Sequence, residues 1–141
     1  MTAQALTVLS TNGLMNFADL RACNGEVICS WTAATAGTVS LAIASQYAGS
    51  LTYKTGITKM KGRIGKIITD PGTPAPTAGY SLTLLDNNSV DVLQSACTSL
   101  SATATAEYVF SPEIIVDSDL TLTVSGAGDG GQGKVTLYFV E

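Results

Sequence analysis

An apolar residue recurs at every second position in several stretches of this chain, and this alternation is the feature that most limits its fold. A period of two places successive side chains on opposite faces of an extended strand, so each stretch predicts a β-strand with one buried face. The pattern is clear in five stretches: "EVICSWT" (Val27, Cys29, Trp31), "TVSLAI" (Val39, Leu41, Ile43), "YSLTLLD" (Tyr80, Leu82, Leu84), "DLTLTVS" (Leu120, Leu122, Val124) and "KVTLYFV" (Val135, Leu137, Phe139).

Further strands are predicted in "KMKGRIGKIIT", where Met60 and Ile64 point inward, and in "EYVF" and "EIIVD", which Ser111-Pro112 separates. Long connections are expected at residues 44–58, 70–79 and 94–106, and "DLTLTVS" and "KVTLYFV" are expected to be adjacent strands. About eight strands with turn signals between them predict an all-β fold, an antiparallel β-sandwich of jelly-roll type. The whole chain, 1–141, is expected to form one domain.

The composition agrees with this fold class. Charged residues make up 13% of the 141 residues, about half of the usual share. Serine and threonine number 13 and 19. Small residues that favour strands and turns are typical of β-proteins and not of helical bundles.

The first 25 residues leave alternatives open. Residues 5–9, "ALTVL", fit either a short strand or part of an extended N-terminal arm over residues 1–10. In "NGLMNFADLRACNG", helical spacing of Leu14, Phe17, Ala18 and Arg21 favours a short helix or irregular segment. Asn24-Gly25 equally fits a two-residue hairpin turn.

Several classes of protein are excluded or disfavoured by what the sequence contains. There is no histidine, which excludes Ser-His-Asp and Cys-His catalysis. Cys23, Cys29 and Cys97 form no C-x-x-C pair, so we expect reduced, packed thiols and no metal site. No carboxylate pair stands out as a general acid and base, and we expect neither an enzyme nor a cofactor. No apolar stretch reaches the roughly 18 residues of a membrane span, and the N-terminus lacks the pattern of a signal peptide.

Two motifs have a functional and a structural interpretation. Residues 128–133, "GDGGQG", satisfy G-x-G-x-x-G, but a strand precedes and a strand follows them, whereas a nucleotide site needs a helix there. We therefore predict a hairpin turn. "DNNSVD", from Asp86 to Asp91, offers oxygen ligands for Ca²⁺ but lacks the spacing of an EF-hand loop, and predicts a turn between strands.

Charge is divided unevenly along the chain. Residues 1–66 carry six cationic side chains against two carboxylates, and residues 67–141 carry nine carboxylates against Lys134 alone, which gives +4 and −8 and sums to the net charge of −4. Lys59, Lys61 and Arg63 form a basic row on one face of the expected strand. This row is either an outward strand face that discourages edge pairing or a docking stripe for an acidic protein. Nucleic acid is not expected as a partner, because no aromatic residues lie among these cations.

The segment "KIITDPGTPAPTAGYSLTLLDNNSVDVLQ" resembles a pattern in small structural proteins of tailed bacteriophages, and so does the ending "LTLTVSGAGDGGQGKVTLYFV". The resemblance covers roughly residues 62–140. Some relatives of similar size are jelly-roll cement, or decoration, proteins that coat the capsid. The chain departs from the pattern at Ser89-Val90, where a glycine is expected, and its first 60 residues show no match.

The resemblance implies a non-enzymatic virion protein that is made in the host cytoplasm, binds the outer head surface and links neighbouring capsid subunits. Its expected partners are the major capsid protein and further copies of itself, as a dimer or trimer. Two alternatives are a head–tail joining protein and a carbohydrate-binding module of a tail or fibre. The second would use Trp31, Tyr47, Tyr53 or Tyr80, although the alternation places Trp31 in the core. The candidate capsid contacts come from the arm, a loop and the basic row: Leu6, Val8, Leu9, Tyr47, Tyr53, Lys59, Lys61 and Arg63.

Overall fold

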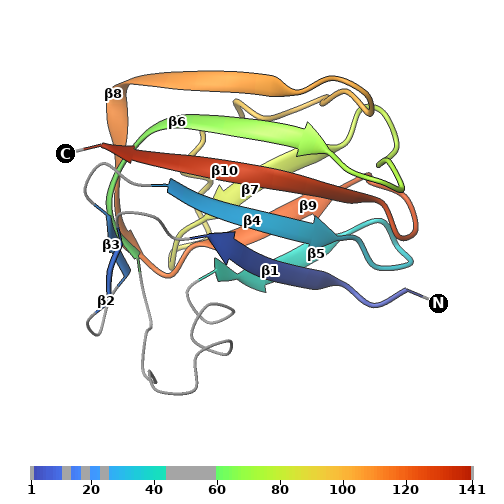
Figure 1. Ribbon diagram of the computed structural model, residues 1–141, viewed down its shortest axis with the longest axis horizontal. Coiled ribbons are helices and arrows are strands. Elements are labelled where there is room, and N and C mark those ends of the chain that lie inside the picture. The colour runs from blue at the N-terminus through green and yellow to red at the C-terminus, as the bar shows by residue number, and fades with distance from the viewer. Residues whose placement is uncertain (1, 11–13, 17–19, 23–25, 44–59, 141) are drawn as a thin grey trace.

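A computed structural model describes residues 2–10, 14–16, 20–22, 26–43 and 60–140. These residues form ten strands in two sheets that pack against each other (Figure 1). The strands are β1 (Ala5–Ser10), β2 (Leu14–Asn16), β3 (Leu20–Ala22), β4 (Glu26–Thr32), β5 (Val39–Ala42), β6 (Met60–Pro71), β7 (Ser81–Leu85), β8 (Ala106–Ser118), β9 (Thr121–Ser125) and β10 (Gln132–Val140).

The two sheets differ in size. The larger sheet has the order β1-β4-β10-β6-β3-β2, and β8 also pairs with β6. The smaller sheet has the order β5-β9-β7. All pairings are antiparallel except a short parallel one between β3 and β6, in which Leu20 lies opposite Met60 and Arg21 opposite Lys61.

From β4 onward, the strands pair like the two arms of one long hairpin. β4 pairs with β10, β5 with β9 and β6 with β8. Inside these pairs, Tyr80 bridges to Leu100 and Leu85 to Asp91. Successive strands of each arm alternate between the larger and the smaller sheet, so the long hairpin is rolled around a single core. This nesting is the topology of a jelly roll, and the predicted fold class is confirmed.

The prediction that "DLTLTVS" and "KVTLYFV" are adjacent strands is wrong. β9 lies between β5 and β7 in the smaller sheet, whereas β10 lies between β4 and β6 in the larger one. Residues 126–131 therefore cross from one sheet to the other and are not a hairpin turn. Alternation shows which face of a strand is buried, but the buried faces of two opposed sheets look alike in sequence.

The N-terminal part also differs from the expectation of a helix. β2 and β3 are antiparallel strands, with Leu14 opposite Ala22. β3 then pairs with β6, and no pairing of β3 with β4 is found among the described residues. Asn24-Gly25, the alternative hairpin turn, lies outside the described residues. Residues 5–10 form β1, which pairs with β4. Of the two alternatives for this segment, the short strand is therefore confirmed, and an arm free of the sheet is not.

The predicted strands "EYVF" and "EIIVD" are parts of one continuous strand, β8. Its pairing with β6 shifts between Ile64 and Lys66, which lie opposite Ile114 and Val109. Between these two pairs, β6 has one residue, Gly65, and β8 has four, residues 110–113. These four residues form a bulge that contains Pro112. A bulge tolerates proline because no ladder hydrogen bond needs its missing N–H.

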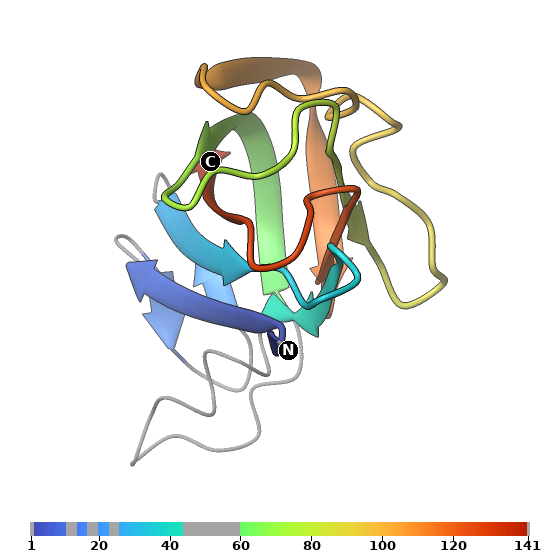
Figure 2. The same cartoon turned by 90° about the vertical axis from the view of Figure 1, so that its right-hand side faces the viewer.

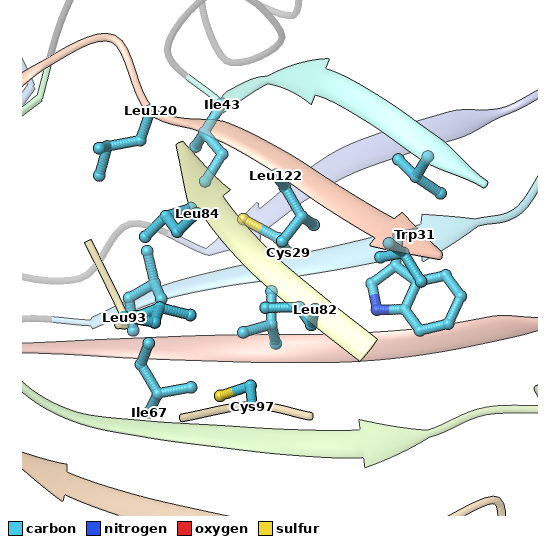
Figure 3. Close-up of a cluster of buried hydrophobic side chains, with 14 of the residues drawn as sticks. Cys29, Trp31, Ile43, Ile67, Leu82, Leu84, Leu93, Cys97, Leu120 and Leu122 are labelled. Atoms are coloured by element: carbon cyan, nitrogen blue, oxygen red, sulfur yellow. The ribbon is translucent and has the colours of Figure 1, made fainter. Parts of the chain in front are cut away.

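The core lies between the two sheets (Figure 3). Of the alternating residues that predicted the five clear strands, all except the partly buried Leu41 are at most 3% exposed. Trp31 of β4 packs against Tyr80 with ring centroids 5.7 Å apart and the ring planes tilted by 53°. An inclined ring pair of this kind adds to the stabilisation from burial.

Two of the three cysteines lie in this core. Cys29 and Cys97 are unoxidised and fully buried, which confirms the expectation for these two thiols; Cys23 lies outside the described residues. Burial raises the pKa of Cys29 to about 12. The pKa of Cys97 also rises to about 12, through burial and then the nearby Asp91. At neutral pH both thiols are therefore protonated and unreactive.

We expect the free energy of unfolding to fall as the pH rises above about 9. Burial raises the pKa of Tyr80 to about 12, as it does for Cys29 and Cys97. Unfolding returns these groups to their ordinary values of 9.0 for the thiols and 10.0 for the phenol. Above pH 9 the unfolded chain therefore binds fewer protons than the folded chain, which lowers stability. Below pH 8 the two thiols and the phenol are protonated in both the folded and the unfolded chain, so their contribution to the free energy of unfolding is at its full value and does not change with pH.

Denaturant titrations at about pH 7, 9 and 10.5 measure this dependence. The Cys29→Ala variant is the control, because it lacks one of the three groups and should show a shallower decline. A free energy of unfolding that stays constant to pH 10.5 would contradict the assignment.

Candidate partner-binding groove

An open groove of about 660 Å³ lies at one side of the sandwich. It is lined by β8, at the rim of the larger sheet, and by the turn that follows β7 of the smaller sheet. The ribbons of these segments can be followed in Figure 2. We call it the edge groove. Its lining residues come from these two segments: Val92, Leu93, Gln94, Ala96, Val109, Phe110, Ser111, Pro112, Glu113, Ile114 and Ile115.

One wall of the edge groove is β8. Val109 and Ile115 on this strand are 70% and 77% exposed, although residues of this size and polarity are usually buried. Phe110 and Ile114 point the other way and pack against the core. Among the described strands, only β6 pairs with β8. β8 therefore presents an apolar surface and a free strand edge to solvent.

The other wall is a turn that the Asp91 carboxylate holds in place. Its Oδ1 accepts hydrogen bonds from the backbone N–H of Leu84 at 3.1 Å and of Leu93 at 3.0 Å, and Oδ2 accepts one from Ser95 at 2.9 Å. Gln94 and Ser95 adopt positive φ angles of 52° and 64°. This conformation is unfavourable for residues other than glycine. The carboxylate thus fixes a turn that its backbone preferences alone would not favour.

The segment covering β7 continues this wall. Leu82 N–H donates to the carbonyl of Cys97 at 2.9 Å, and Leu100 N–H donates to the carbonyl of Tyr80 at 2.7 Å. Leu93 and Cys97 are buried beneath the segment. Both walls of the edge groove are therefore parts of the hydrogen-bonded sandwich.

The turn "DNNSVD" lies at the tip of the long hairpin. Asp86 Oδ1 accepts from the backbone N–H of Asn88 at 2.8 Å and of Val90 at 3.1 Å. The Asn87 N–H donates to Ser118 Oγ at 2.8 Å. This pattern is an Asx turn, which confirms the structural interpretation. No cluster of three or more potential metal ligands occurs among the described residues.

Glu113 is the only ionisable residue among those that line the edge groove. The other two carboxylates on β8 lie close to cations of β6. Glu107 is 3.5 Å from Lys66 Nζ, and Asp117 is 4.0 Å from Lys61 Nζ. The groove therefore has a local negative charge within a mostly apolar lining, whose uncharged polar residues are Gln94 and Ser111.

The basic row proves not to be a continuous positive stripe. Lys61 and Arg63 lie on β6, but Lys61 faces Asp117 across the strands and Arg63 lies opposite Ile115; Lys59 is outside the described residues. The charges that separate along the sequence come together on this face, because β6 from the basic half pairs with β8 from the acidic half. This mixture of charges makes the row a poorer match for an acidic partner than its sequence suggests.

The remaining candidate contacts are placed as follows. Leu6 is 5% exposed because its side chain belongs to the core, so little of it is accessible for the expected capsid contact. Val8 lies opposite Cys29 in the pairing of β1 with β4. The structure describes the backbone of Val8 and Leu9 but not their side chains. Tyr47 and Tyr53 also lie outside the described residues.

Neither described aromatic of the carbohydrate alternative is exposed. Trp31 and Tyr80 are each 1% exposed, as the alternation predicts for Trp31. Carbohydrate recognition by aromatic stacking needs an exposed ring face, and these two rings face each other inside the core. They cannot form a binding platform.

The residues of the G-x-G-x-x-G match serve packing. The match follows β9 and ends in β10, with no helix in the described chain to complete a nucleotide site. A Cβ atom at Gly131 would lie 2.5 Å from the Ala127 carbonyl oxygen, and one at Gly37 would lie 2.7 Å from the Gly128 nitrogen. Glycine is required because backbones approach closely where the chain changes sheets.

The edge groove was not predicted from the sequence. Its signal lies in "EYVF" and "EIIVD", where Val109 and Ile115 are apolar on the face opposite to Phe110 and Ile114. Apolar residues on both faces predict a strand that is covered on both sides. β8 is covered on one side only, so its second apolar face is exposed to solvent.

Comparisons with known proteins do not assign this chain to a family. No protein-family model matches the chain, and no curated protein matches it. Among solved structures, it is similar to an RmlC-like cupin protein from Desulfovibrio desulfuricans, with 8% identity and a TM-score of 0.39 over 96% of this chain and 81% of that one. It is also similar to the low-affinity xylan-binding module CBM86 from Roseburia intestinalis, with 10% identity and a TM-score of 0.36 over 97% of this chain and 96% of that one.

Likeness at this level carries no argument about function, and the fold assignment rests on the strand pairings themselves. Within the described residues, no helix is long and apolar enough to cross a membrane.

Proposed function

We propose that this chain is a non-enzymatic structural protein of a phage virion, a decoration protein that binds the outer head surface and links neighbouring capsid subunits. The observation that carries the proposal is the edge groove, where Val109 and Ile115 stay exposed beside a free strand edge. An exposed apolar surface on an ordered scaffold is typical of a site for another protein chain.

The sequence resemblance supports the same interpretation. It covers roughly residues 62–140, and every residue that lines the edge groove lies within that range. Residues 92–94 of the groove belong to the first matching segment, and β8 lies between the two segments that carry the resemblance. The proposed surface therefore does not depend on the unmatched first 60 residues.

The buried thiols are consistent with a role that needs no catalysis. The raised pKa values of Cys29 and Cys97 leave both as thiols at neutral pH, and a thiol is a poor nucleophile. A decoration protein acts instead through many modest contacts. Copies that touch the capsid and each other gain affinity, because simultaneous contacts raise the effective concentration of each one.

The test is the number of copies per major capsid protein in purified particles, measured by quantitative mass spectrometry. We expect on the order of one copy for every one or few capsid subunits, because a protein that links neighbours repeats with the lattice. A handful of copies per particle would indicate the head–tail joining alternative. Absence from particles would overturn the virion proposal.

Substitutions of exposed residues test whether the edge groove makes the contact with the particle. Val109→Ser and Ile115→Ser together are expected to lower occupancy on particles that lack the protein by about tenfold or more, because each removes apolar contact area. Val90→Ser is the matched control: Val90 is also exposed, at 55%, but does not line the groove. An equal loss of binding in the control would contradict this assignment.

A further inference from the structure

The edge groove combines three properties that together describe its occupant. Its surface is apolar at Val109 and Ile115, its one ionisable lining residue is Glu113, and its β8 wall has an edge that no described strand covers. A free strand edge pairs with an extended segment, and the side chains beside it select the sequence of that segment.

We infer that the edge groove binds an extended segment of another protein that carries a lysine or arginine between apolar residues. Valine-sized side chains of the segment pack on Val109 and Ile115, and its cation lies near the Glu113 carboxylate. The inference deepens the proposed function, because it gives the chemistry of the segment that a capsid partner would present.

Charge argues against a second copy of this chain as the occupant. The described strands at the other sheet edges are β1, β2, β5 and β7, and none of them contains a charged residue. A second β8 would bring its own Glu113 toward Glu113, which is unfavourable for paired strands. The cations on β3, β6 and β10 lie on interior strands of the larger sheet. No described edge strand of this chain therefore supplies a cation, and we assign the segment to a different protein.

The bulge of β8 limits how the segment lies. Pro112 has no N–H to donate, and residues 110–113 are out of register with β6. Continuous pairing along all of β8 is thereby prevented, which also protects the edge from indiscriminate strand addition. The occupant is consequently a short segment whose side chains reach across the bulge.

The experiment uses the isolated chain of residues 1–141, labelled with ¹⁵N, and a capped heptapeptide as the probe. Valine, lysine and valine occupy the second, fourth and sixth positions of the peptide, and threonine occupies the others. In an extended chain these three side chains share one face. The control peptide has glutamate in place of lysine. Amide chemical shifts locate binding, and titration gives the Kd of each peptide.

We expect shift changes at residues 92–96 and 109–115 and an affinity for the lysine peptide about threefold to tenfold higher than for the glutamate peptide, as a partly exposed charge pair provides. Glu113→Lys should reverse this preference. Glu107→Lys is the matched control, because Glu107 is a carboxylate of the same strand that does not line the groove, and it should keep the preference for lysine. Unchanged melting temperatures establish that the variants are folded.

Three results of the peptide titrations would overturn the inference. These are the absence of shift changes at millimolar peptide, equal affinities for the two peptides, and changes confined to another face. Concentration-dependent shifts at the same residues without peptide would also overturn it, in favour of a second copy. The experiment needs no virus particles, so absence of the protein from virions would refute the proposed function and leave the peptide specificity standing.

Discussion

Replacing Trp31 with alanine is expected to lower the free energy of unfolding by about 3–5 kcal/mol, the usual cost of truncating a buried tryptophan. Trp31 is 1% exposed and belongs to the largest fully buried side chains of the core. The substitution removes its contact with Tyr80 and leaves a cavity between the two sheets. Such a loss is a large part of the stability of a domain of this size.

Denaturant titration followed by far-ultraviolet circular dichroism measures the change, since the variant lacks the fluorescent ring. Trp31→Phe is the matched control. The Nε1 atom of Trp31 is buried and has no hydrogen-bond partner within the described part of the chain, so phenylalanine keeps much of the packing and removes none of the described hydrogen bonds. We expect it to cost less than half as much as alanine. Similar losses for both variants would mean that the environment of the ring differs from the one described.

The second large effect is expected for Gly133→Ala, which should lower the free energy of unfolding by about 2–3 kcal/mol, as overpacking of a core does. A Cβ atom at Gly133 would lie 2.5 Å from Cζ2 and 2.8 Å from Cε2 of Trp31, and 3.0 Å from the Asp70 carbonyl oxygen. Gly133 lies in the pairing of β10 with both β4 and β6, opposite Trp31 and Pro71. Neither the backbone nor the enclosed ring has room to move.

Gly65→Ala is the matched control for this substitution. Gly65 also lies in the larger sheet, but a Cβ atom there meets only side-chain atoms, with Val140 Cγ1 nearest at 3.1 Å. We expect a change within about 1 kcal/mol. A double-mutant cycle sharpens the test, because Gly133→Ala should cost much less in a Trp31→Ala background, where the clashing ring is absent. Strict additivity would contradict the contact.

The alternation of apolar residues predicted the strands well because burial of one face is a local property of the sequence. "EVICSWT" corresponds to β4, Glu26–Thr32, in full. The partners of each strand depend on distant segments, and the same pattern in β9 and β10 fits either sheet. The adjacency of these two strands was therefore predicted wrongly, although both were correctly identified.

The candidate site was less predictable for the same reason. Leu6 was expected to be exposed on an N-terminal arm, but its side chain is buried because β1 pairs with β4. Val109 and Ile115 look like core residues and are exposed because β8 lies at a sheet edge. In both cases the position of the strand within the sheet decides the exposure of its side chains, and that position is a property of the whole fold. Residues 14–16 and 20–22 show the same limit, since their helical spacing yields to pairing in the sheet.

The position of β10 has a consequence for how the protein is made. β10 is the last of the described strands along the chain, and it lies in the middle of the larger sheet, between β4 and β6. Until β10 emerges from the ribosome, both of those strands keep an open edge, and the pair of β4 with β10 joins segments about a hundred residues apart. Such distant pairings form slowly and leave strand edges exposed in the meantime. A nascent chain that stops before residue 132 thus lacks the strand that joins β4 to β6, and we expect it to leave the larger sheet incomplete.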